Sequence, residues 1–464
     1  MVNTNPKLKI IDQCFWCVFL VLVAGLSFVN TTPYSFQWLF VYALIFSHAG
    51  FYCLFRSFVE IKPIDIKKTK PIFILLFLIL IWQVMQLVLP VPSHFPQLIF
   101  FNTQISWLAP FQTWSVTPER TQWSILTQFL MIVLFALTLT LLNNRRRLKQ
   151  LLFVFLLVGV VHAFLAIGAK YTGQFLVDKK SLDGHFNAAR GLFVNRNHLA
   201  AFTVLCFFSP LTMQLYRLAK KTSASLFKEV FFSVIYLGFL LLLFLVIVLS
   251  ESRGALLSLG LCLCFCFFVR KKIFFFDIGN NYFLPIMYFC FFGFILFFGQ
   301  EILERLSSLS LGERTLQWQI TWQAIKHQWL TGYGSGSYEL VFQGFRNYAD
   351  LRLVIYDQAH NDYLHILLEQ GIIGLVLWLS FIVISISRAF KYCRNTNSLL
   401  LKTTLFSVII SVSAILIQSL VGYPLQIMAI RCYFFIIIAM IFAVPQIGMK
   451  TESKNNKNKQ SNYV

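Results

Sequence analysis

Charge is scarce in this sequence. Only 12% of the 464 residues are charged, and the 18 acidic residues are outnumbered by 39 Lys and Arg. Hydrophobic residues make up 58% of the chain, and its mean hydropathy is +0.71. A soluble domain of this composition would expose large apolar patches, whereas a lipid bilayer accepts them. The composition therefore excludes an ordinary soluble protein and indicates a membrane protein.

The chain also lacks an internal repeat, a glycine- or proline-rich linker and a disulfide framework. Its ten cysteines lie mostly within apolar runs, where cysteine is usually a small apolar side chain that fills space. No small-residue cleavage site follows the first apolar run, so we expect a retained first helix rather than a removed signal peptide.

Apolar runs long enough to cross a bilayer, roughly 20 residues each, recur along almost the whole chain. We therefore predict an all-α integral membrane protein with about 12 transmembrane helices and one large external loop that carries amphipathic helices. The predicted spans are 11–29, 36–55, 71–90, 123–142, 151–169, 199–216, 229–249, 254–269, 282–299, 366–387, 403–421 and 427–447.

The distribution of basic residues predicts the orientation of the chain. With the N-terminus in the cytoplasm, most of the 39 Lys and Arg fall on the cytoplasmic side, as the positive-inside rule requires. The formal net charge of +21 thus reflects topology, and we expect no nucleic-acid partner. In this arrangement both termini are cytoplasmic.

Four segments follow from this topology: helices one to nine within 1–299, a large external loop over 300–365, helices ten to twelve within 366–449, and a cytoplasmic tail over 450–464. The tail is polar and is predicted to be disordered. External stretches 91–122, 170–198 and 300–365 are long enough to carry function, and the last is the main polar segment of the chain.

Within the 300–365 loop, Arg314–Leu330 is predicted to form an amphipathic helix. One stripe of this helix contains Trp318, Trp322, Ile325 and Trp329. Tryptophans on one face suit a helix that lies at the membrane interface. Such a stripe more often packs against the protein than contacts a substrate. A turn with Gly332, Gly334 and Gly336 follows; it could cradle a phosphate, but glycines after a helix more often only end it.

Four polar clusters lie on the predicted external side, within 190–200, 250–255, 312–318 and 360–374. His360 in the last cluster could act as a general base, because histidine titrates near neutrality and can accept a proton from a hydroxyl. A cap on the tenth span is the alternative role. If a helix begins near His360, Gly371 and Gly374 lie on the same face and let a neighbouring element approach closely.

The other clusters contribute arginines. A single arginine at a membrane boundary usually extends to lipid head groups. Several beside one polar loop would instead bind a phosphorylated lipid, because guanidinium groups hold phosphate oxygens through paired hydrogen bonds. The external arginines that we select are Arg190, Arg196, Arg253 and Arg314.

These clusters, in this order, resemble the O-antigen ligase and O-antigen polymerase superfamily over about residues 185–445. The strongest motifs are Gly312-Glu313-Arg314 with Trp318, Gly332-Tyr-Gly334-Ser-Gly336, and His360-Asn361 followed after nine residues by Gly371-x-x-Gly374. Asn195-Arg196-Asn197-His198 and Ser252-Arg253-Gly254 resemble further motifs. Trp329 departs from the family, which often has proline before the glycine-rich turn.

The resemblance implies a GT-C-like, metal-independent glycosyltransferase of the bacterial inner membrane that needs no cofactor. A glycan on undecaprenyl pyrophosphate would pass to an acceptor hydroxyl at the periplasmic face, beside membrane lipid. His360 would activate the acceptor. The pyrophosphate would be held by Arg196, Arg253 and Arg314, with support from Arg190, Asn195, Asn197, His198, Asn361, Gly371 and Gly374.

The acceptor distinguishes the alternatives within this superfamily. A ligase acting on lipid A-core is our first choice, because the histidine and paired-glycine pattern resembles the ligases. A polymerase of O-antigen or exopolysaccharide repeats is close behind, and a protein O-oligosaccharyltransferase is also open. A polysaccharide transporter or flippase is less favoured, because the spans show few internal charges and no paired broken helices.

Overall fold

The computed structural model describes residues 6–29, 35–59, 66–90, 113–173, 188–220, 226–274, 310–346 and 356–461. Within these ranges the regular secondary structure is helical. The first eight helices are α1 (Pro6–Leu26), α2 (Phe36–Phe58), α3 (Ile66–Val88), α4 (Pro118–Leu141), α5 (Arg145–Thr172), α6 (Arg196–Ala219), α7 (Leu226–Leu249) and α8 (Arg253–Phe274). The others are α10 (Ser310–His327), α11 (Tyr338–Phe345), α12 (Asp362–Asn395), α13 (Leu399–Gln418), the 3-10 helix η3 (Pro424–Gln426) and α14 (Met428–Ser461).

Ten helices in the described part are long and apolar enough to cross a membrane, and the apolar part of α8, Arg253–Phe265, is shorter. The predicted all-α polytopic membrane fold is confirmed. The predicted ninth span, 282–299, lies outside the described residues. Helix α14 continues to Ser461, through most of the tail for which the sequence predicted disorder.

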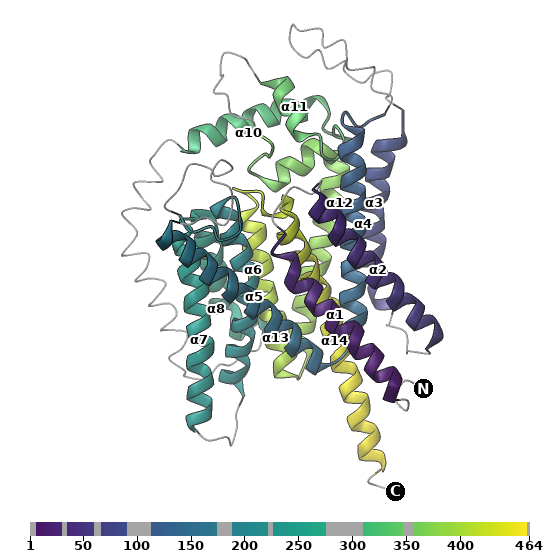
Figure 1. The fold of residues 1–464 in the computed structure, drawn as a ribbon, viewed down its shortest axis with the longest axis vertical. Helices are drawn as coiled ribbons and strands as arrows, with labels where there is room; N and C mark the ends of the chain where they lie inside the picture. The colour runs from purple at the N-terminus through teal and green to yellow at the C-terminus, as the bar shows by residue number, and fades with distance from the viewer. Residues whose placement is uncertain are drawn as a thin grey trace.

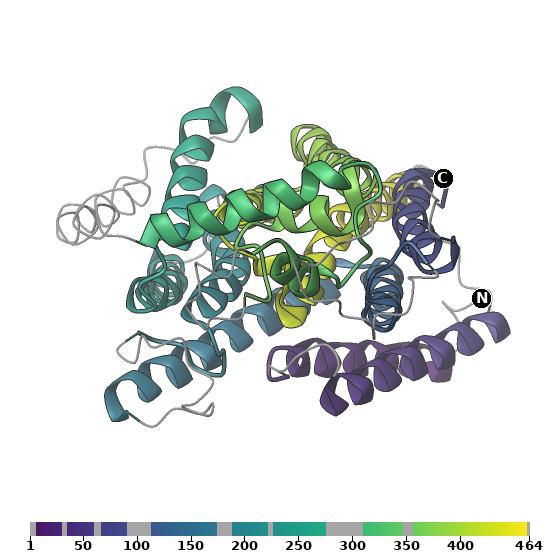
Figure 2. The same cartoon turned by 90° about the horizontal axis from the view of Figure 1, so that it is seen from above.

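The helices form a bundle with a separate layer at one end (Figure 1). Helices α10 and α11 make this layer, and α1 begins and α14 ends at the opposite end. Seen from above, α10 lies across the ends of the bundle helices (Figure 2). Helix α10 therefore covers the end of the bundle at which the site described below is assembled.

Three helices form the centre of the bundle. The apolar windows of α6, α13 and α14 are 89%, 78% and 94% buried, against 17% for α1. In the centre, the ring of Tyr433 packs edge-on against Phe155 and Phe202, and its hydroxyl donates to the carbonyl of Val23. Peripheral helices expose large apolar side chains such as Phe51, as expected where helices contact lipid.

Helix α12 is broken at Gly371, where φ is +65° and ψ is −171°. The expectation of a continuous helical face from His360 to Gly374 was therefore wrong. At the break, the backbone N–H of Ile372 donates to the carbonyl of Trp329 at 2.8 Å, and that of Gly334 donates to Glu369 at 2.9 Å. The glycine-rich turn after α10 thus docks on α12 through backbone contacts and fixes the α10–α11 layer on the bundle.

We expect Gly371→Ala to prevent stable folding. A Cβ atom at this position would overlap the backbone of Leu330 and Thr331, and its φ lies in the left-handed region. Unfavourable backbone angles alone cost about 1–3 kcal/mol, and the overlap adds to this cost. The measurement is the yield of monodisperse protein in size-exclusion chromatography after detergent extraction.

Gly238→Ala is the matched control, because a Cβ atom there meets nothing within 4 Å and alanine favours a helix by up to about 1 kcal/mol over glycine. A normal yield of the Gly371→Ala protein would show that the close approach between the turn and α12 is not required for folding.

Candidate active site

The backbone that carries His360 is held by α10. The indole Nε1 of Trp318 donates to the carbonyl of Ala359 at 3.0 Å, and the amide of Gln317 donates to the carbonyl of Gln358. His360 itself has φ of +49°, which is uncommon for a residue other than glycine. The hydrogen bonds from α10 therefore stabilise an unfavourable backbone conformation that presents the imidazole to the site.

The imidazole of His360 is partly buried and lies close to a cation. Burial, and secondly the charge of Arg314, lower the pKa of His360 to about 4. Its Nδ1 atom is buried and has no hydrogen-bond partner among the described residues. At neutral pH the ring is therefore uncharged and has the protonation state that a general base requires.

Tyr423 lies between two imidazoles. Its ring is nearly perpendicular to those of His360 and His198, with a centroid separation of 4.9 Å in each case. Tyr423 belongs to the turn between α13 and η3. Sequence analysis missed this residue; the available signal was a short turn, with glycine and proline, on the predicted external side between the last two spans.

Three predicted arginines converge beside His360. Burial, and then the charges of Arg253 and Arg196, lower the pKa of Arg314. The guanidinium of Arg314 donates to the carbonyl of Val421 at 3.0 Å, and that of Arg196 pairs with Glu251 at 2.9 Å. Among the side chains that the structure describes here, three cations and one carboxylate leave an excess of positive charge, which a bound anion would neutralise.

Two of these arginines lie at the N-terminal ends of helices. Arg196 and Arg253 are the first residues of α6 and α8. Asn195 caps α6, because its side chain accepts from the backbone N–H of Asn197 at 2.8 Å. The positive ends of the two helix dipoles therefore add to the arginine charges at the same end of the bundle.

The remaining predicted residues have supporting contacts. Asn361 caps α12 by accepting from the backbone N–H groups of Tyr363 and Leu364, and it donates to the carbonyl of Leu420 at 2.9 Å. Arg190 is buried and donates to the carbonyl of Val194 at 3.1 Å. Arg190 thus supports the turn before α6, whereas Arg196, Arg253 and Arg314 interact with one another.

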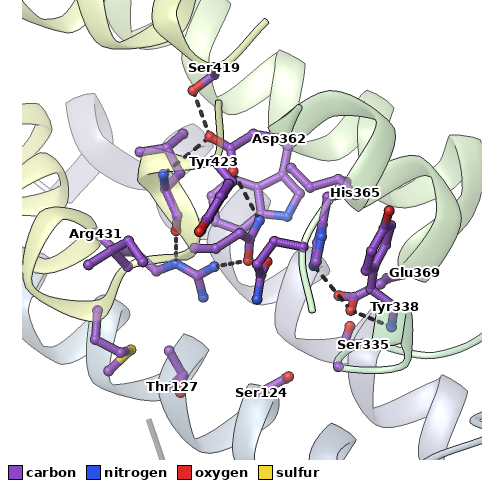
Figure 3. Close-up of a pocket in the computed structure, with 18 of the residues that line it drawn as sticks. Ser124, Thr127, Ser335, Tyr338, Asp362, His365, Glu369, Ser419, Tyr423 and Arg431 are labelled. Carbon is purple, nitrogen blue, oxygen red and sulfur yellow. Dashed lines mark hydrogen bonds and ion pairs between the residues drawn. The ribbon is translucent and has the colours of Figure 1, made fainter. Parts of the chain in front are cut away.

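A cavity of about 1180 Å³ lies beside this cluster, between α4, α12 and α14. Figure 3 shows its buried charged side chains. Asp362 accepts from the hydroxyl of Ser419 at 2.7 Å, and His365 lies 3.2 Å from Glu369. Arg431 donates to the side chain of Gln426 at 2.7 Å.

Sequence analysis assigned no role to these cavity residues. Asp362 was noted only as part of the fourth cluster. Arg431 lies within the last predicted span, and an arginine inside a transmembrane segment is itself a signal of a functional or structural polar site.

These features define a multi-pass membrane protein in which helix ends gather a neutral histidine and three arginines beside a large cavity lined by both polar and apolar side chains. Residues 238–379 match the family model described as "O-Antigen ligase", which confirms the resemblance to the O-antigen ligase superfamily. The matched segment contains Arg253, Arg314 and His360. No curated protein sequence matches the chain.

Proposed function

We propose that the protein is an O-antigen ligase-type glycosyltransferase. It transfers a glycan from undecaprenyl pyrophosphate to a hydroxyl of lipid A-core at the periplasmic face of the bacterial inner membrane. The observation that carries this proposal is the convergence of Arg196, Arg253 and Arg314 beside the neutral imidazole of His360.

The proposed reaction is a displacement at the anomeric carbon. His360 accepts the proton of the acceptor hydroxyl, and the acceptor oxygen forms a bond to the anomeric carbon of the donor glycan. The bond from this carbon to the phosphate oxygen breaks, and undecaprenyl pyrophosphate leaves with the electron pair. The imidazolium then releases its proton to water.

The arginine cluster has the charge that this leaving group needs. Negative charge grows on the pyrophosphate as the bond breaks, and fixed cations that already point to this position stabilise the transition state. The donor carries its own activated bond, so the reaction requires no nucleotide.

The acceptor class is tested by deletion of the gene and complementation with the wild-type gene, with separate analysis of lipopolysaccharide-linked and undecaprenyl-linked glycan. A ligase deletion loses long glycan on lipid A-core and accumulates long undecaprenyl-linked glycan. A polymerase deletion leaves lipid-linked glycan that is one repeat long. Loss of glycan only from proteins would identify a protein O-oligosaccharyltransferase.

The same strains test the transporter alternative. In spheroplasts of the deletion strain, a ligase leaves the accumulated glycan accessible to an added glycosidase, because the donor has already crossed the membrane. Accumulated glycan that the glycosidase cannot reach would contradict the transferase proposal and favour a flippase.

A further inference from the structure

A separate groove lies between α1 and α5, at the other end of the bundle from the candidate active site. It has a volume of about 640 Å³ and is lined by Leu20, Arg145, Arg146, Lys149, Gln150, Phe153 and Val154. Helix α1 begins at the end opposite the α10–α11 layer (Figure 1), and Asp12 near its start pairs with Arg147 near the start of α5. The distribution of basic residues predicts that this end is cytoplasmic.

The groove carries positive charge. Three exposed cations line it, namely Arg145, Arg146 and Lys149, and no carboxylate lines it among the residues that the structure describes. The neighbouring Arg147 is instead buried, and its guanidinium donates to the side chain and the backbone carbonyl of Asp12 at 2.6 and 2.9 Å. The nearby carboxylate is therefore already paired, and the positive charge of the groove favours a bound anion.

The groove changes from charged to apolar along α5. Its cations lie in the first turns of this candidate membrane span, and Phe153 lies one turn after Lys149, about 6 Å further along the helix axis. Phe153 is 61% exposed, and Leu20 of α1 lines the same part of the groove. The cations therefore lie at the level of lipid head groups, and the apolar side chains lie at the level of acyl chains.

Side-chain contacts hold the walls of the groove in place. The indole Nε1 of Trp16 on α1 donates to the side chain of Gln150 on α5 at 2.9 Å, and the Cζ atom of Arg147 lies 5.3 Å from the Trp16 ring centroid. The Nζ atom of Lys149 lies 5.9 Å from the ring centroid of Tyr216 on α6. These contacts fix α1 against α5 without a ligand, so the groove is a preformed site.

We propose that this groove binds an anionic glycerophospholipid. The phosphate of the head group contacts Arg145, Arg146 and Lys149, and an acyl chain lies along Leu20 and Phe153. A basic pocket between membrane helices suits such a head group, and guanidinium groups hold phosphate oxygens through paired hydrogen bonds. A soluble phosphate compound would use only the cationic part, whereas a lipid fills both parts. The site lies away from the candidate active site and does not depend on the proposed transferase function.

The test removes two charges from the groove. Arg145→Gln/Lys149→Gln replaces two exposed side chains that lie one helical turn apart. Lys391→Gln/Arg394→Gln is the matched control, because it also removes one exposed lysine and one exposed arginine. These two residues lie near the end of α12, which begins at the candidate active site and therefore ends on the same side of the membrane as the groove. Both double variants lose the same formal charge, and only the first alters the groove.

Binding is measured by native mass spectrometry of the delipidated full-length protein in non-ionic detergent. The probes are anionic dioleoyl phosphatidylglycerol, zwitterionic dioleoyl phosphatidylcholine and water-soluble glycerol phosphate. We expect the wild type to prefer phosphatidylglycerol, and the groove variant to bind it about 30-fold more weakly. The control variant should bind it within about twofold of wild type, as for surface changes outside the site. Glycerol phosphate should not displace the bound lipid.

Three results would overturn the proposal. Equal weakening in both double variants would mean that general surface charge, rather than the groove, attracts the lipid. Equal binding of the two lipids would mean that the negative head group is not recognised. Displacement by glycerol phosphate would identify a site for a soluble phosphate compound. If the groove variant aggregates in size-exclusion chromatography, Arg146→Gln removes a third exposed cation of the groove, and unchanged phosphatidylglycerol binding by that protein would equally contradict the proposal.

Discussion

Replacement of His360 by alanine should slow glycan transfer by about 10²- to 10⁴-fold, the range typical for loss of a general base, with normal protein levels in the membrane. The lowered pKa of about 4 keeps the imidazole neutral at physiological pH. The alanine variant retains the arginine cluster, so the donor should still bind. The measurement is the transfer rate of purified protein with lipid-linked donor, alongside pyrophosphate binding.

The pH dependence of the wild-type rate gives a second test of His360. A base with a lowered pKa is active above that pKa and loses activity as the pH falls through it. The kcat/KM of the free protein should therefore decrease below about pH 4. Bound pyrophosphate is anionic and stabilises the imidazolium, so the corresponding inflection in kcat should lie at a higher pH.

His327→Ala is the matched control for His360→Ala. His327 is the last residue of α10, in the same layer, and its ring contacts Phe345 instead of the candidate site. Its replacement should leave the transfer rate within about twofold of wild type, because a surface substitution usually changes the free energy of unfolding by no more than about 0.5 kcal/mol. If both alanine variants lose activity equally, or if neither does, His360 is not the base.

Much of the fold could be predicted because its main signal is local. A span needs only a run of apolar residues of sufficient length, and most of the predicted spans recur as helices. The placement of Arg196, Arg253 and Arg314 near helix ends on one side of the bundle followed from the same topology. Their convergence did not, because it depends on how α6, α8 and α10 meet at one end of the bundle.

The break in α12 and the cavity required tertiary information. The apolar stretch around Gly371 fits an unbroken helix equally well, and its positive φ accompanies backbone hydrogen bonds to a segment about forty residues earlier in the chain. Tyr423 has no motif of its own; its place between His198 and His360 depends on three separate segments. Local patterns therefore predicted the candidate groups, while long-range packing determines which of them lie close together.

Arg314→Ala should lower kcat/KM about 10²- to 10³-fold, the loss typical of removing one donor that stabilises a developing oxyanion. Burial, and then the positive charges of the nearby Arg253 and Arg196, lower the pKa of Arg314. In the free protein these like charges repel one another, and the negative charge of a bound pyrophosphate offsets this repulsion. Arg314→Lys keeps the charge but loses the planar group that bonds phosphate through two N–H donors, so its activity should be intermediate.

Thermal unfolding separates this function from a structural role. Pyrophosphate at 100 times its Kd should stabilise the wild type by about 2.7 kcal/mol, seen as a higher Tm, and should stabilise Arg314→Ala much less. Arg346→Ala is the control, because it removes a cation from the end of α11. The Cζ atom of Arg346 lies 5.6 Å from the ring centroid of Tyr356. An equal loss of pyrophosphate stabilisation in Arg346→Ala would mean that overall positive charge, rather than the arginine cluster, holds the donor.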